Sequence, residues 1–128
     1  MNPPALHHLA LKIVDLAVAE AFYVGVLGLP ILRRWPLADG QGDRSVWLDL
    51  GAGAFLALEK AGVVREPKHE DETGYHLFAL RIRRDDRAAL MNRLTTAGFP
   101  VYQETAFTFY VRDPEGNRLG ISHWPDSL

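Results

Sequence analysis

One pattern of apolar and polar residues occurs in the first half of the chain and returns in the second. Residues 7–13 alternate as a β-strand does, and residues 16–27 carry apolar side chains at helical spacing, with Asp15 placed as an N-cap. Gly28 and Pro30 end this helix. Further strand-like runs follow at residues 30–35, 44–50 and 54–60, the last two joined by the turn GAG. The first half therefore predicts the order βαβββ.

The same order is predicted after a charged stretch. Residues 61–74 contain Pro67 and Gly74, which is typical of a linker or loop. YHLFALRI at 75–82 predicts a strand, and residues 85–97 predict a helix that ends before GFP. Three more strands are expected at residues 101–104, 107–113 and 117–124, the last two joined by the turn DPEGN.

Short matches favour an internal duplication. HLALKI at 8–13 corresponds to LFALRI at 77–82, and the helix-ending GLP corresponds to GFP. We expect an α+β fold with two tandem βαβββ modules in one domain that spans residues 1–128. Its parts are module one at 5–60, the linker at 61–74 and module two at 75–124.

Composition narrows the function classes. The chain has 128 residues, of which 48% are hydrophobic, enough for a proper core. A net charge of -2 without a basic block gives no electrostatic footprint for nucleic acid or an acidic membrane surface. The absence of cysteine excludes thiolate metal sites and disulfides. No apolar window approaches the roughly 18 residues of a membrane span, so we expect a cytoplasmic protein.

The modules, together with the segments FYVGVLGLP and VRDPEGNRLGI, resemble the vicinal oxygen chelate superfamily. This family includes glyoxalase I, bleomycin-resistance proteins, fosfomycin-resistance enzymes, extradiol dioxygenases and methylmalonyl-CoA epimerase. The resemblance implies a cupped, mostly antiparallel mixed sheet with helices outside, a pocket for a small organic molecule, and a homodimer. It also implies a divalent metal, zinc, nickel, iron or manganese, which acts as a Lewis acid in the family's enzymes.

The resemblance places up to four metal ligands on the first and last strands of the modules. The resemblance puts His8 in the first place, because HLALKI matches the family's first-strand pattern from its ligand onward. Alternation agrees, since it puts His8 and Lys12 on one strand face and His7 on the other. The other three places lack donor atoms: Ala57, Leu77 and Gly120. One imidazole cannot hold a divalent ion tightly, so a degenerate metal site is expected.

Glu59 is a candidate second metal ligand, because it shares the strand parity of Ala57. A β-bulge near the site could turn His76 or His123 toward the pocket. Without such a bulge, His8 and Glu59 make two ligands, short of the usual three of a catalytic site.

The ligand-binding residues expected from the sequence are His8, Lys12, Trp47, Glu59 and Tyr110. A neutral His8 suits a general base near pH 7, and it equally suits a simple hydrogen bond to a ligand. Lys12 pairs with an acid such as Glu59 or with a bound anion, or it extends to solvent. Trp47 and Tyr110 fall at equivalent places in the two modules, with their faces undetermined.

Three hypotheses about function follow. The first is a protein that binds a small organic molecule in an apolar cup with no cofactor, as bleomycin-resistance proteins do by sequestration. The second is a divalent-metal-dependent lyase, isomerase or dioxygenase that uses His8 and Glu59, so enzymatic activity stays open. The third is a non-catalytic assembly module whose cup is filled by its own side chains.

Overall fold

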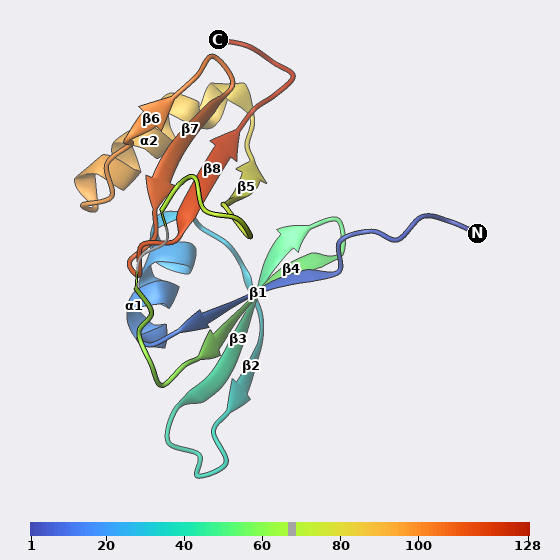
Figure 1. Cartoon of the computed structure of the whole chain (residues 1–128), viewed down its shortest axis with the longest axis vertical. Coiled ribbons are helices and arrows are strands. Elements are labelled where there is room, and N and C mark those ends of the chain that lie inside the picture. Colours follow the sequence, from blue (N-terminus) through green and yellow to red (C-terminus); the bar gives the residue numbers. More distant parts are fainter. Residues whose placement is uncertain (67–68) are drawn as a thin grey trace. The chain divides into compact units, whose positions relative to one another are not determined.

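The computed structural model describes residues 1–66 and 69–128, and it divides into two compact units, residues 1–65 and 66–128 (Figure 1). Pro67, part of the expected linker, lies outside the described residues. Each unit contains one four-stranded mixed sheet. Among the described residues, no helix combines the length and hydrophobicity of a transmembrane segment.

The first unit follows the predicted order βαβββ, which confirms the α+β assignment for this half. Its elements are β1 (His8–Ile13), α1 (Leu16–Glu20), a π-helical segment (Ala21–Val26), β2 (Ile31–Pro36), β3 (Asp43–Gly51) and β4 (Ala54–Lys60). The strands lie in the order β1-β4-β3-β2, with β1 and β4 parallel and the other pairs antiparallel. The last strand of the unit thus lies beside the first.

Local chemistry explains where the first helical segment begins and ends. Asp15 caps α1, because its carboxylate accepts a hydrogen bond of 3.1 Å from the backbone N–H of Val18. Gly28 has a φ of 79°, and its N–H donates to the carbonyl of Val24 at 3.1 Å. This helix buries Ala19, Phe22 and Tyr23, and α1 contacts β4. The core of this unit therefore lies between the helix and one face of the sheet.

The second unit repeats the order, with some different boundaries. Its elements are β5 (Phe78–Arg81), a 3-10 turn (Arg84–Asp86), α2 (Arg87–Thr96), β6 (Gln103–Glu104), β7 (Thr108–Arg112) and β8 (Arg118–Ser122). The strand order is β5-β8-β7-β6, with β5 and β8 parallel. The strand expected at 75–82 is shorter than predicted, since β5 begins at Phe78.

Asp113 shapes the DPEGN turn between β7 and β8. Its buried carboxylate accepts hydrogen bonds from the backbone N–H of Glu115 at 2.9 Å and of Asn117 at 2.8 Å. The side-chain amide of Asn117 donates to the same carboxylate at 2.9 Å. Gly116 adopts a φ of 86°, which a residue with a Cβ rarely adopts. The turn thereby sets the antiparallel pairing of β7 with β8.

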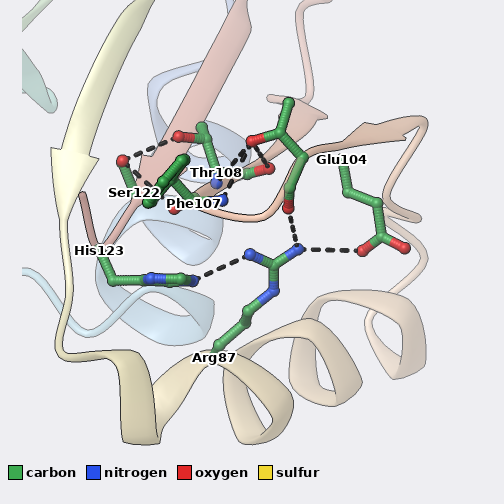
Figure 2. A network of polar contacts seen from close by, with 7 residues as sticks. Arg87, Glu104, Phe107, Thr108, Ser122 and His123 are labelled. Carbon is green, nitrogen blue, oxygen red and sulfur yellow. Dashed lines mark hydrogen bonds and ion pairs between the residues drawn. The ribbon is translucent and has the colours of Figure 1, made fainter. Parts of the chain in front are cut away.

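A buried arginine joins α2 to the sheet (Figure 2). Arg87 is 4% exposed, and its guanidinium donates to Nε2 of His123 at 2.9 Å and to the carbonyl of Thr105 at 2.9 Å. It also pairs with Glu104 at 3.2 Å and lies 5.6 Å from the ring of Phe109. Burial of the guanidinium is tolerated because several protein acceptors replace the hydrogen bonds that it would make with water.

This network also decides the role of His123. Because Nε2 accepts from Arg87, the ring proton sits on Nδ1, which contacts the carbonyl oxygen of Asp126. Both ring nitrogens are therefore used in structural contacts. The suggestion that a bulge turns His123 toward a metal finds no support in this arrangement.

Replacing Arg87 by methionine should lower the free energy of unfolding by about 3 kcal/mol, because buried acceptors on His123 and Thr105 would lose their donor. Urea denaturation followed by circular dichroism measures this change. Arg83→Met, at an exposed side chain, is the matched control and should stay within about 0.5 kcal/mol of wild type. An equally small effect of Arg87→Met would show that the network is not stabilising.

Candidate functional site

The first unit has one sheet face that α1 does not cover, which we call the open face. On β1, Leu9, Leu11 and Ile13 are partly or fully buried, whereas His8 and Lys12 on the opposite face are exposed. This alternation is that of a strand with one packed face. Lys12 and His8 therefore lie together on the open face.

Strand register arranges the open face in three rows that run across the sheet. The first row is His8, Phe55 and Asp49 on β1, β4 and β3. The second row is Ala10, Ala57, Trp47 and Arg33 on β1, β4, β3 and β2. The third row is Lys12, Glu59, Ser45 and Trp35 on the same four strands. Side chains within a row are neighbours on adjacent strands.

Four rings form a continuous series on this face, and we call them the aromatic series: His8, Phe55, Trp47 and Trp35. The ring centroids of His8 and Phe55 are 4.8 Å apart, with planes at 8°. Phe55 and Trp47 follow at 4.4 Å, and Trp47 and Trp35 at 5.3 Å. The guanidinium carbon of Arg33 lies 3.6 Å from the Trp35 ring centroid. These distances are those of stacking and cation–π contacts, which a flat ligand could extend.

The two adjacent histidines contact each other directly. Nδ1 of His7 lies 2.9 Å from Nδ1 of His8, so one ring donates the hydrogen and the other accepts it. His7 is exposed, and its ring also meets Phe55 edge-on at 5.5 Å. His8 therefore keeps Nε2 for any hydrogen bond to a ligand.

The structure does not bring His8 and Glu59 to one point. Glu59 is the register partner of Lys12, four positions along β1 from His8. Four residues of strand span ~13 Å. The donor atoms of two ligands on one zinc ion are at most ~4 Å apart, since each bond to the metal is ~2 Å. Within the described residues, no ion pair within 4.0 Å joins Lys12 to Glu59.

The second unit repeats the arrangement of the first. Gly120 pairs with Ala79 and Tyr110, as Ala57 pairs with Ala10 and Trp47. Trp47 and Tyr110 therefore occupy equivalent places on β3 and β7, and both rings are half-buried. Leu77 immediately precedes β5, and His76 before it is exposed.

Neighbouring side chains fill the space beside Gly120. A Cβ atom at this position would lie 3.3 Å from Cε1 of Tyr110 and 3.3 Å from Cβ of Ala79. Both distances are shorter than ordinary van der Waals contact, and Gly120 is buried. A side chain here would require Tyr110 and Ala79 to shift by a few tenths of an ångström, so this place is crowded.

The residues present do not fit the divalent metal that the family implies. Of the four equivalent places, only His8 carries a donor atom. In residues 1–66 and 69–128, no three or more histidine, aspartate or glutamate side chains gather where they could hold a metal ion.

A positive group on the second unit was not expected from the sequence. Arg112 and Arg118 face each other across β7 and β8, and both lie near one carboxylate oxygen of Glu70, at 3.9 and 3.6 Å. Arg112 also lies 4.9 Å from the ring centroid of Tyr102. Burial raises the pKa of Tyr102 above its ordinary value, although the charge of Arg112 opposes this. This charged cluster belongs to the second unit, whereas the aromatic series belongs to the first.

Sequence reasoning also missed part of the aromatic series. It named His8 and Trp47 but neither Phe55 nor Trp35. The parity of Phe55 with Ala57 was a usable signal, because residues two apart on a strand share a face. Trp35 is harder to place, since the pairing of β2 with β3 shifts register on both sides of Arg33–Trp35.

Comparisons with solved structures agree with this fold. A glyoxalase/dioxygenase from Nostoc punctiforme has a TM-score of 0.77 at 20% identity, covering 95% of this chain and 92% of that one. An antibiotic binding protein, TnmS3, from Streptomyces sp. CB03234 has a TM-score of 0.66 at 24% identity, covering 96% and 98%. A mutant of the fosfomycin resistance protein FosX from Listeria monocytogenes, complexed with Mn(II) and 1S,2S-dihydroxypropylphosphonic acid, has a TM-score of 0.74 at 15% identity, covering 94% and 93%.

No curated protein matches the sequence. Residues 5–121 match the family described as the Glyoxalase/Bleomycin resistance protein/Dioxygenase superfamily, which confirms the resemblance seen in the two repeated modules. The chain belongs to this superfamily.

Proposed function

We propose that this protein binds and sequesters a small organic molecule on the open face of β1–β4, without a catalytic metal. The observation that carries the proposal is the state of the four family ligand positions. Only His8 has a donor atom, and the place at Gly120 is crowded by Tyr110 and Ala79. An enzyme of the metal-dependent type would lack the ion that stabilises its oxyanion.

The open face has the chemistry that such binding requires. Small-molecule sites are mostly apolar and carry a few polar groups that orient the ligand. The aromatic series supplies stacking surface, and Nε2 of His8, Lys12 and Glu59 supply polar atoms at its margins. The similarity to an antibiotic binding protein supports the same class of function.

Gly120→Glu should destabilise the protein by at least about 2 kcal/mol, because overpacking costs ~1–3 kcal/mol and a buried carboxylate adds to this. Thermal unfolding with and without Mn(II) measures both stability and metal binding. Gly62→Glu is the matched control, since no atom lies within 4 Å of a Cβ placed there. A Gly120→Glu variant that keeps wild-type stability and is stabilised by Mn(II) would show that the place is open.

A chemically diverse fragment library, screened by ligand-observed NMR in the presence of EDTA, tests the proposed function itself. We expect fragments that bind wild type, lose binding in Trp47→Leu and keep binding in Trp124→Leu. Trp124 is the matched control because it is 64% exposed and lies outside the aromatic series. Absence of binding fragments, or binding that EDTA abolishes, would contradict the proposal.

A further inference from the structure

Two buried hydrogen-bond donors on the open face have no partner among the described residues. Ser45 is 2% exposed, and its hydroxyl oxygen makes no hydrogen bond there. The indole nitrogen of Trp35 is likewise buried and without a hydrogen-bond partner. Native proteins satisfy the great majority of their buried polar groups, so each exception calls for a physical explanation.

The two donors come from facing residues of adjacent strands. Trp35 on β2 and Ser45 on β3 are register partners, and both belong to the third row of the open face. Register partners on antiparallel strands have Cβ atoms about 5 Å apart. An acceptor oxygen that enters between these two side chains could therefore accept from both the indole N–H and the hydroxyl.

The ring of Trp35, which carries one of these donors, already stacks against another planar group. The guanidinium of Arg33, itself planar, lies 3.6 Å from the centroid of the Trp35 ring. Arg33 is exposed, so its side chain is free to move into solvent. A conjugated ring could then take its place on the indole at the same stacking distance.

The donor pair favours a ligand that carries an acceptor. Ser45 pairs with Glu59 on its other side, while Lys12 in the same row and Arg33 on the Trp35 ring are cations, so charges of both signs lie beside the donors. These charges do not separate an anionic oxygen from a neutral carbonyl. An ammonium group would leave both protein donors unsatisfied, because it has no acceptor.

Resting on the proposed function, we infer that the ligand is a flat aromatic molecule with a carbonyl group. Its oxygen accepts hydrogen bonds from the indole of Trp35 and the hydroxyl of Ser45, and its ring stacks on the Trp35 end of the aromatic series. The binding involves no covalent step. Affinity then depends on both the ring and the carbonyl.

Three probes separate these requirements in isothermal titration calorimetry: acetylnaphthalene, ethylnaphthalene and cyclohexyl methyl ketone. Acetylnaphthalene should bind wild type at least about fivefold more tightly than ethylnaphthalene, which has similar shape but no acceptor. Cyclohexyl methyl ketone, which has the acceptor but no flat ring, should bind more weakly than acetylnaphthalene by a similar factor.

Ser45→Ala and Trp35→Phe each remove one donor, so each should reduce the preference for acetylnaphthalene over ethylnaphthalene, two probes of similar shape. Ser127→Ala and Trp124→Phe, at exposed positions outside the open face, should leave the preference unchanged. Reporting affinity as a ratio of two probes in the same variant separates recognition from a general loss of stability.

Equal binding of the two naphthalenes would overturn the carbonyl requirement, and equal binding of the aliphatic ketone would overturn the flat ring. If none of the probes binds while other fragments do, the inferred ligand class is wrong and the proposed function stands. If neither probes nor fragments bind, both fail.

Discussion

The parallel pairing of the first and last strands in each module is the constraint on which the site depends. It sets Ala10 beside Ala57 in the first unit and Ala79 beside Gly120 in the second. Because side chains alternate between faces, this single register decides which groups meet on the open face. It separates His8 from Glu59 along the strands and places the ring of His8 beside that of Phe55. The fold is therefore that of the superfamily, while of the four places at which the resemblance puts metal ligands only His8 carries a donor atom.

Much of this could be predicted from sequence, because the signals are local or repeated. The alternation of HLALKI places His8 and Lys12 on one face, and the exposure of β1 shows the same alternation. The duplicated order βαβββ follows from glycine and proline punctuation, and the structure reproduces it in both units. The repeat also identifies Ala57 and Gly120 as equivalent, and their pairing with Ala10 and Ala79 agrees.

The remainder depends on contacts between strands that no local pattern records. The distance from His8 to Glu59 requires the register of β1 on β4. The crowding at Gly120 depends on the ring of Tyr110 on the neighbouring strand, which is a long-range packing outcome. The burial of Arg87 is equally hidden, because its acceptors come from segments after β6 and β8. Charged residues are almost never buried alone, so only the assembled network explains it.

Metal content measured by inductively coupled plasma mass spectrometry, on protein purified without chelator or metal-affinity resin, tests the central claim most directly. The account predicts far less than one equivalent of zinc, nickel, iron or manganese per chain, because one imidazole is the only donor among the four family positions. About one equivalent of a single metal per chain, lost in His8→Ala and kept in His69→Ala, would contradict it.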